Sequence, residues 1–297
     1  MGQVEDHVSD QVDAGDGTLH QVRGGNGVRL AVRTAGPADA PAIVLLHGWA
    51  QSGGVFAAQL ADPRLTGKYR LVVPDLRGHG ASDVPDVAGG YDNSEAWAGD
   101  VAAVLELAGK PAVLLGWSYG GVVVTDYLRT YGDKDLAGIV FAAAATEVGR
   151  DRPGAKPGSA MLSVVPYANV EDPASAARGF AEFVRGMARN QLPGELARRI
   201  VGDSLRVPRQ VRRALLRRDL DSSGVLASIT VPALVAHGRL DAVVDPAVAE
   251  YTHGKISGAE MRWFEEVGHL PFAERTEEFD EMLLEFAGRA LNRENPE

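Results

Sequence analysis

The chain has 297 residues, of which 45% are hydrophobic and 24% charged, a composition that supports a globular protein with one large core. It contains no cysteine, which excludes disulfides, thiolate metal sites and cysteine nucleophiles. The net charge of −10 argues against nucleic acid as a partner, and no apolar run approaches the roughly 20 residues that would cross a bilayer. No signal peptide is visible, so a cytoplasmic location is expected.

The chain begins with a polar segment and a predicted hairpin. Residues 1–17 are rich in Asp, Gly and Gln and predict a flexible N-terminal tail. Residues 19–35 predict two strands joined through the Gly-Gly-Asn-Gly sequence at residues 24–27, because Asn-Gly is a strong hairpin signal.

Strands and helices alternate through the rest of the chain. Helices are predicted over residues 93–108, where Gly109 marks the stop, and over residues 276–291. Six apolar runs predict further strands, at residues 43–46, 69–73, 111–115, 139–142, 232–236 and 261–264. This alternation predicts an α/β fold, with a mainly parallel sheet covered by helices on both faces and an antiparallel edge made by the hairpin.

The alternation stops between the sixth and seventh predicted strands. Residues 146–222 hold no convincing strand, but a Pro/Gly-rich loop at residues 152–158 and then three helical patterns, near residues 176–187, 195–205 and 210–220. An insertion at this place lies where α/β sheets bind ligands, at the carboxyl ends of the strands. We therefore expect a helical cap over residues 146–222 and a core made of residues 18–145 and 223–297.

The expected cap is basic although the whole chain is acidic. Residues 146–222 carry 13 Arg and one Lys against nine acidic residues, a net charge of +5, so the remainder carries −15. A solvated face of Arg-rich helices explains this pattern. The alternative is that the cap docks an acidic carrier protein that presents a thioester.

A candidate nucleophile follows the run at residues 111–115. Residues 116–120 read Gly-Trp-Ser-Tyr-Gly and lie between a predicted strand and a predicted helix. This is the context of the G-x-S-x-G nucleophile elbow, a tight turn that needs glycine neighbours and exposes its serine hydroxyl. Ser118 is therefore the candidate nucleophile, and a plain Gly-rich turn is the alternative. The N–H of Tyr119 would point to where an oxyanion forms.

A serine hydroxyl needs a base, and the base needs an orienting carboxylate. His269, between the last strand and the last helix, is the candidate base. His237 ends the preceding strand and is interpreted as structural.

Three carboxylates could orient the base. Asp241 is favoured, because it follows the penultimate strand after a glycine-containing turn. Asp245 precedes Pro246 and is expected to cap the next helix, and Glu147 is a second competitor. The order Ser118, Asp241, His269 is the chain order of α/β-hydrolases.

The loop after residues 43–46 should supply a second oxyanion donor, the N–H of Trp49. Two other histidines, His47 and His79, are interpreted as buried structural residues. No pair of histidines has metal-ligand spacing with a nearby carboxylate, so neither a metal nor a cofactor is implied.

Together these motifs resemble the α/β-hydrolase superfamily, in the branch that holds carboxylesterases, non-haem haloperoxidase-like perhydrolases and epoxide hydrolases. The segments that carry the resemblance are residues 47–49, 75–82, 116–121, 238–241 and 268–269, and it covers residues 19–292. It implies an α/β-hydrolase fold with a cap between the sixth and seventh strands. It also implies an acyl-enzyme mechanism, with Ser118 as nucleophile, His269 as base and then acid, and Asp241 orienting the imidazole.

Differences between this sequence and those of related enzymes reduce the number of reactions expected of it. Epoxide hydrolases and haloalkane dehalogenases carry Asp where this chain has Ser118, and perhydrolase-like members usually have Pro where it has Ala50. The loop at residues 49–53 is less Gly-rich than in carbon–carbon bond hydrolases.

The expected function is cleavage of an ester or lactone of a small to medium organic molecule. The alternatives are a biosynthetic thioesterase or cyclase, a carbon–carbon bond hydrolase with the same triad, and a non-catalytic ligand-binding protein. Four cap side chains either line the pocket or pack the cap on the core: Met161, Leu162, Phe180 and Phe183.

Overall fold

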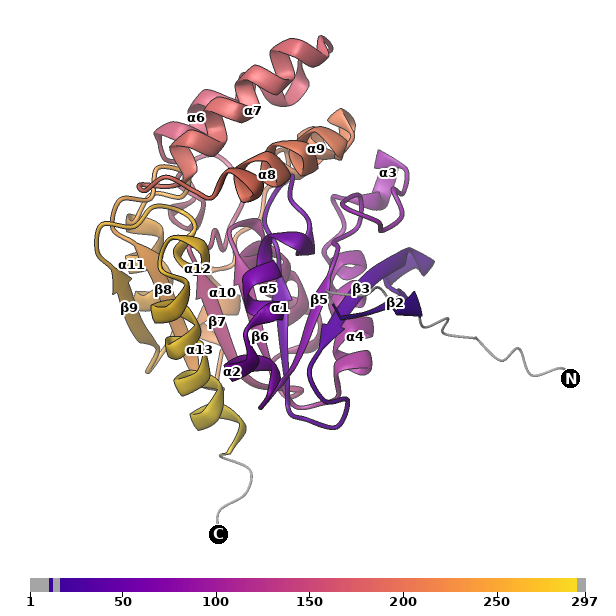
Figure 1. The fold of residues 1–297 in the computed structure, drawn as a ribbon, viewed down its shortest axis with the longest axis vertical. Coiled ribbons are helices and arrows are strands. Elements are labelled where there is room, and N and C mark those ends of the chain that lie inside the picture. Colours follow the sequence, from indigo (N-terminus) through magenta and orange to yellow (C-terminus); the bar gives the residue numbers. More distant parts are fainter. Residues whose placement is uncertain (1–10, 13–16, 293–297) are drawn as a thin grey trace, which may run out of the picture.

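A single sheet organises the protein (Figure 1), whose computed structural model describes residues 11–12 and 17–292. Nine strands form it in the order β1-β2-β3-β5-β4-β6-β7-β8-β9. The pairs β1–β2, β2–β3 and β3–β5 are antiparallel, and the remaining five pairs are parallel. The strands are β1 Gln11–Val12, β2 Thr18–Arg23, β3 Arg29–Ala35, β4 Ala42–Leu46, β5 Arg70–Pro74, β6 Ala112–Trp117, β7 Leu136–Ala142, β8 Ala233–Gly238 and β9 Glu260–Phe264.

Helices cover both faces of this sheet (Figure 1). On one face α1 packs against α13, which also contacts β6 and β7; on the other, α4 packs on α5, and α10 lies against α5 and α11. The helices outside residues 146–222 are α1 Ala57–Ala61, α2 Pro63–Thr66, α3 Val87–Gly90, α4 Ser94–Ala108, α5 Tyr119–Tyr131, α10 Ser223–Ala227, α11 Ala247–Lys255, α12 Pro271–Glu274 and α13 Thr276–Leu291.

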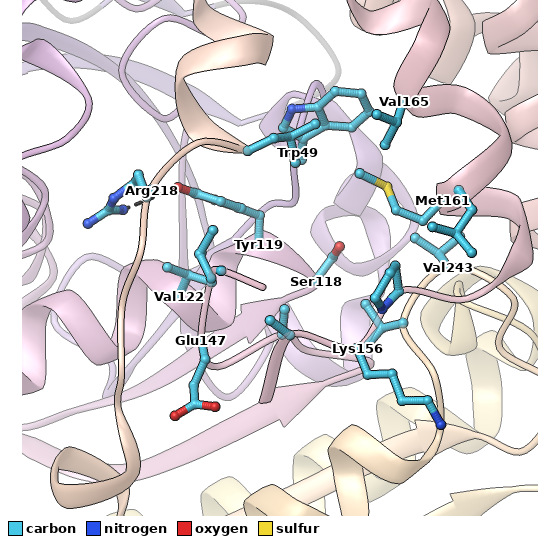
Figure 2. Close-up of a pocket in the computed structure, with 18 of the residues that line it drawn as sticks. Trp49, Ser118, Tyr119, Val122, Glu147, Lys156, Met161, Val165, Arg218 and Val243 are labelled. Atoms are coloured by element: carbon cyan, nitrogen blue, oxygen red, sulfur yellow. Dashed lines mark hydrogen bonds between the residues drawn. The ribbon is translucent and has the colours of Figure 1, made fainter. Parts of the chain in front are cut away.

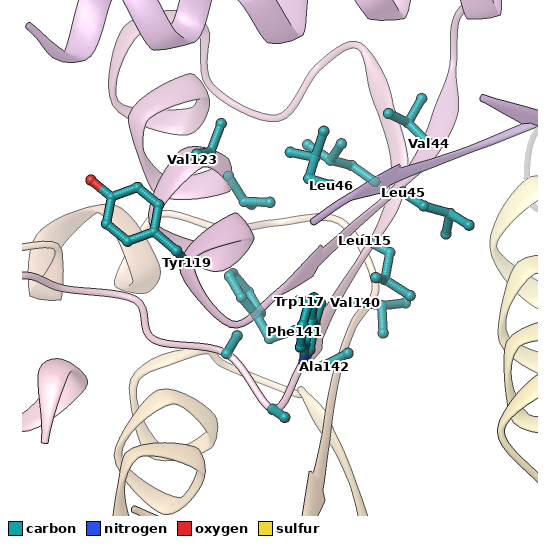
Figure 3. Close-up of a cluster of buried hydrophobic side chains, with 14 of the residues drawn as sticks. Val44, Leu45, Leu46, Leu115, Trp117, Tyr119, Val123, Val140, Phe141 and Ala142 are labelled. Atoms are coloured by element: carbon teal, nitrogen blue, oxygen red, sulfur yellow. The ribbon is translucent and has the colours of Figure 1, made fainter. Parts of the chain in front are cut away.

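The central strands are almost entirely apolar because helices cover them on both sides. Every residue of β4, β6, β7 and β8 is buried. Figure 3 shows Leu45, Leu115 and Val140, from three of these strands, with Val123 of α5 on the other side of the sheet. This core fixes the strand ends, where the candidate site residues lie.

The fold class predicted from the sequence is confirmed. All eight predicted strands are present, and Asn26 takes the left-handed conformation (φ 57°) in the turn between β2 and β3. The ninth strand, β1, pairs Gln11 with Leu19. Residues 1–10 and 13–16 of the predicted tail lie outside the described residues.

Residues 146–222 cross the carboxyl ends of the strands as a layer of helices, between β7 and β8 (Figure 1). We call this segment the cap. Its short 3-10 turns are η3 Pro153–Ala155 and η4 Val165–Asn169, and its helices are α6 Ser159–Val164, α7 Pro173–Met187, α8 Gly194–Arg206 and α9 Arg209–Leu215. The sequence patterns did not predict α6.

One cap prediction was wrong at its end. The helical pattern at residues 210–220 predicted a longer helix, but α9 ends at Leu215. Leu220 instead forms an antiparallel bridge with Val148, and the buried Arg218 pairs with Asp126 of α5 at 2.8 Å. These contacts, with Val148 of the cap and Asp126 of the core, draw the chain out of the helical path.

A buried carboxylate on α13 makes the stability of the fold depend on pH. Asp280 is fully buried and accepts a 2.8 Å hydrogen bond from Gln59, while its Oδ2 has no hydrogen-bond partner among the described residues. Burial, with a contribution from the neighbouring Asp62, raises the pKa of Asp280 to about 7 although the Gln59 hydrogen bond opposes this. The folded state then binds more protons than the unfolded state between about pH 4 and pH 7, so stability falls as the pH rises through that window.

The Asp280→Asn variant is therefore expected to be more stable than the wild type at pH 8 by about 1–2 kcal/mol, with a smaller gain at pH 5. Urea unfolding at the two pH values measures this difference. The exposed neighbour Glu281 provides the control, since Glu281→Gln should leave stability unchanged at both. An equal gain at pH 5 and pH 8 would contradict the titration of Asp280.

Candidate active site

Ser118 lies at the sharp turn where β6 ends and α5 begins. Its backbone has φ 55° and ψ −122°, a strained conformation for a residue with a side chain. The glycines around it are required by close backbone contacts, because a Cβ on Gly116 would lie 2.6 Å from a carbonyl carbon of Gly120. A Cβ on Gly48 would likewise lie 2.8 Å from that of Ser118. The local sequence thus forces the serine out of the sheet.

Asp241 and His269 form a hydrogen-bonded pair beside this turn. His269 Nδ1 lies 2.8 Å from Asp241 Oδ2, and both residues are buried. The backbone N–H of His269 donates to the carbonyl of Met187 at 2.6 Å. The indole N–H of Trp117 donates to the backbone carbonyl of His269 at 2.9 Å. Helix α7 of the cap and the strand of the elbow therefore both hold the histidine in place.

The carboxylate of Asp241 is held in its charged form. Its Oδ1 accepts two backbone N–H groups, from Val243 at 2.7 Å and Val244 at 3.0 Å. Burial opposes the charge, but attraction to His269 and hydrogen bonds from His237 and His269 hold the pKa of Asp241 below its usual value. Asp241 is thus suited to orient an imidazole and to stabilise its cation.

The competing carboxylates have other partners. Asp245 accepts the N–H of Ala247 at 2.9 Å, as a helix cap should, and pairs with Lys156 at 3.0 Å. Glu147 accepts the backbone N–H groups of Gly154 and Ser222 and the hydroxyl of Tyr251. Of the three candidates, Asp241 is the one bonded to His269.

Ser118 and His269 line one cavity of about 480 Å³ together with Trp49 and Tyr119. Figure 2 shows the Ser118 hydroxyl pointing into the space bounded by Trp49 and Met161. Other apolar side chains of the lining include Val122, Val148, Leu162, Val165, Phe183, Met187, Leu216, Val243 and Val244. Phe180 instead packs behind Trp49, with ring centres 6.0 Å apart. The cavity therefore lies between the elbow and the cap.

The loop that carries Trp49 is held by two buried neutral histidines. His79 accepts the N–H of Ala50, which has φ 56°, and donates to the carbonyl of Arg77. His47 accepts the N–H of Leu76 and donates to its neighbour Gly48. Burial lowers the pKa of His47 to about 4 and, with repulsion from His47, that of His79 to about 3. Both rings thus fix backbone, as their structural interpretation expects.

The same loop is also tied to the cap. The Trp49 indole N–H donates to the carbonyl of Arg212 at 3.0 Å, and Gln51 donates to Ser204 Oγ at 2.9 Å. Two further hydrogen bonds continue this connection, from Ser52 to Asp203 at 2.6 Å and from Arg199 to the Gly54 carbonyl at 3.0 Å.

Sequence reasoning did not find these cap contacts, nor a contact between His237 and Asp241. The loop and its cap partners lie about 150 positions apart, and no pattern in the sequence links them. His237 does precede Asp241 by four residues in a glycine-containing turn, which was the one available signal.

Within residues 17–292, His, Asp and Glu side chains form no group of three or more that could hold a metal ion. None of the helices described combines the length and the hydrophobicity that a bilayer crossing requires.

Comparison with known proteins identifies the family. The sequence model of the Alpha/beta hydrolase family matches residues 43–282, so this chain belongs to that family. A pimeloyl-[acyl-carrier protein] methyl ester esterase from Aromatoleum aromaticum is 30% identical over 253 residues, which cover 80% of this chain and 94% of that protein.

Solved esterases share the whole fold. The esterase RhEst1 from Rhodococcus sp. ECU1013 is 37% identical with a TM-score of 0.83, over 91% of this chain and 98% of that one. The esterase EaEST from Exiguobacterium antarcticum is 29% identical with a TM-score of 0.78, over 90% and 98% of the two chains. These similarities support hydrolase activity of the esterase class.

Proposed function

We propose that the protein is a serine esterase that cleaves a carboxylic ester or lactone of a small to medium organic molecule through an acyl-enzyme. The observation that carries this proposal is the buried Asp241–His269 pair, whose imidazole lines the same cavity as Ser118. The similarity to esterases supports the same reaction.

In this mechanism Ser118 Oγ attacks the ester carbonyl carbon while His269 Nε2 takes the hydroxyl proton. Asp241 holds the Nδ1–H of the imidazole and stabilises the cation. His269 then gives its proton to the leaving alkoxide, and the acyl group stays on Ser118. Water, deprotonated by the same imidazole, attacks the acyl carbon. The bond from that carbon to Ser118 Oγ then breaks, the imidazole returns its proton to Ser118 Oγ, and the carboxylic acid is released.

Two backbone N–H groups would stabilise the oxyanion. Tyr119 is the first residue of α5, so its N–H belongs to the first-turn amides that have no carbonyl partner within the helix. Trp49 supplies the second N–H from the loop held by His79. Each such donor contributes on the order of 3–4 kcal/mol of transition-state stabilisation.

A serine-directed phosphonate tests the proposal, because it bonds stably to an activated hydroxyl. The protein should gain the mass of one phosphonyl group on the peptide that contains Ser118. In parallel it should lose turnover of p-nitrophenyl butyrate. Labelling at another residue, or full turnover after Ser118 is labelled, would contradict the assignment.

The contact between the cap and the Trp49 loop leads to a milder prediction. Ser204→Ala removes the acceptor of Gln51 and should loosen the loop, which lowers kcat about fivefold if about 1 kcal/mol of transition-state stabilisation is lost. KM for p-nitrophenyl butyrate should change little. Ser163→Ala, which removes a cap hydroxyl bonded to the nearby Ala160 carbonyl, is the control. Equal kcat in both variants would show that the cap does not support the Trp49 loop.

A second candidate substrate is an ester or thioester carried by an acidic carrier protein. Arg209, Arg213 and Arg217 follow one another at four-residue spacing and line a surface groove of about 560 Å³. Arg217 also lines the cavity of Ser118, so this basic groove adjoins the mouth of the site. The relative from Aromatoleum aromaticum is named for a substrate of this kind.

Charge reversal on the groove distinguishes this candidate. Arg213→Glu should raise KM for an acyl-carrier-protein substrate about tenfold at low salt, with a smaller effect at high salt, because screening weakens the attraction. Turnover of p-nitrophenyl butyrate should be unchanged. Arg23→Glu makes the same charge change on β2, away from the cap, and should leave both substrates unaffected. Equal KM values for the carrier substrate would contradict docking at this groove.

A further inference from the structure

We propose that His237 is a positioning residue that holds the charged oxygen of Asp241 toward His269. This inference rests on the proposed function, since it assigns a role in the same reaction. His237 is the penultimate residue of β8 and is fully buried, and its Nε2 lies 3.1 Å from Asp241 Oδ2. That oxygen is the one that also accepts His269 Nδ1. Two imidazoles therefore share one carboxylate oxygen.

The proton on His237 can be placed from its neighbours. Nε2 faces two acceptors, Asp241 Oδ2 and the carbonyl of Val244 at 3.1 Å, so it must carry hydrogen. Nδ1 is buried and has no hydrogen-bond partner among the described residues. A proton there would be left unsatisfied, which indicates a neutral ring protonated at Nε2.

The ring is held by packing from the outside. His237 is paired with Trp263 across β8 and β9, and the two rings meet edge to face with centres 6.1 Å apart. Arg239 covers Trp263, with its guanidinium carbon 3.8 Å from the centre of a Trp263 ring. His237 cannot turn away from Asp241 without disturbing this stack.

The contacts to the two oxygens of Asp241 divide into two pairs. Backbone N–H groups of Val243 and Val244 hold Oδ1, and the two histidines hold Oδ2. Without His237, Oδ2 would keep His269 as its one hydrogen-bond partner. The carboxylate would then be more basic and would stabilise the cation of His269 more strongly.

Other charges around this group are paired or lie at its edge. Asp245 is paired with Lys156, and Glu274 accepts the N–H groups of Gly268 and Leu270 beside His269. Arg239, outside Trp263, lies 3.3 Å from Glu265. These charges are the same in the variants below, so a change in pH dependence reports on the His237 contact.

Two substitutions of equal chain length test the inference. His237→Gln keeps an N–H near the position of Nε2, whereas His237→Met has no donor. In the Met variant the acid limb of the pH profile of kcat/KM for p-nitrophenyl butyrate should move to higher pH by about 0.5–1 unit. The reason is that His269, the base in the free enzyme, is protonated more readily. Its kcat at the optimum should fall several-fold, while the Gln variant stays close to the wild type.

A merely structural role predicts a different result, namely loss of activity or stability without a shift of the acid limb. An unmoved limb in the Met variant, or an equal shift in the Gln variant, overturns the inference. Nitrogen-15 NMR of histidine-labelled wild type gives a second measurement that needs no variant. It should show His237 neutral and protonated at Nε2, and a proton on Nδ1 would also overturn the inference.

The outcomes separate this inference from the proposed function. Ester turnover that survives removal of the Ser118 hydroxyl would reject the proposed mechanism itself. Turnover that depends on Ser118, together with an unmoved acid limb in His237→Met, would reject only the role of His237.

Discussion

The Ser118→Ala variant is expected to lose ester turnover by about 10⁴-fold or more, because no other group would supply the attacking oxygen. Its fold should be unchanged. Alanine can occupy the same strained backbone conformation at φ 55° as serine does, and the close approach of Gly116 and Gly120 is unaffected. Steady-state kinetics with p-nitrophenyl butyrate measures the loss, and thermal melting checks the fold.

A matched control is Ser228→Ala, which removes an exposed hydroxyl bonded to the Val225 carbonyl. It should keep full activity. Turnover by Ser118→Ala within tenfold of the wild type would show that the reaction uses another nucleophile, and the elbow would then be a plain strand-to-helix turn.

The Asp241→Asn variant is expected to lower kcat by about 10⁴-fold, as loss of the orienting carboxylate does in other triads. The two backbone N–H groups from Val243 and Val244 would select the amide oxygen, so the introduced NH₂ would point at the two histidines. His269 would then have to accept at Nδ1 and carry its proton at Nε2. In that tautomer it cannot take the proton from Ser118.

Asp245→Asn is the natural control for that variant, because it neutralises a carboxylate four residues away that caps α11 and pairs with Lys156. Its kcat should stay within about twofold of the wild type. If the two variants lose activity equally, orientation by Asp241 is not what the reaction needs. If Asp241→Asn keeps its activity while Ser118→Ala is inactive, another group must orient His269.

The strand framework was predictable because buried parallel strands are apolar along their whole length. The residues of β4, β6, β7 and β8 stand out as hydrophobic runs. The alternation of these strands with helices allows only a few arrangements of the strands in a sheet. Parallel strands also end at one edge of the sheet. Ser118, Asp241 and His269 each follow a strand, so their proximity was predictable although their spacing in the chain is large.

The cap was less predictable because its contacts are non-local. Helix α6 has six residues, too few for a periodic pattern to stand out. The end of α9 is fixed by Val148 and Asp126, which lie far away in the sequence. The interpretation of His237 as structural omitted its contact with Asp241, because composition and spacing do not reveal which way an imidazole at a strand end points.

The four hydrogen bonds between the Trp49 loop and helices α8 and α9 also bear on redesign of this protein. Swapping the whole segment 146–222 for that of another hydrolase would strip Trp49, Gln51 and Ser52 of their partners and slow the reaction for every ester alike. Substitutions confined to Met161, Leu162 and Phe183, on the α6 and α7 side of the cavity, change the shape of the cavity and leave those partners in place. Libraries that seek new selectivity should therefore keep Asp203, Ser204 and the backbone at Arg212.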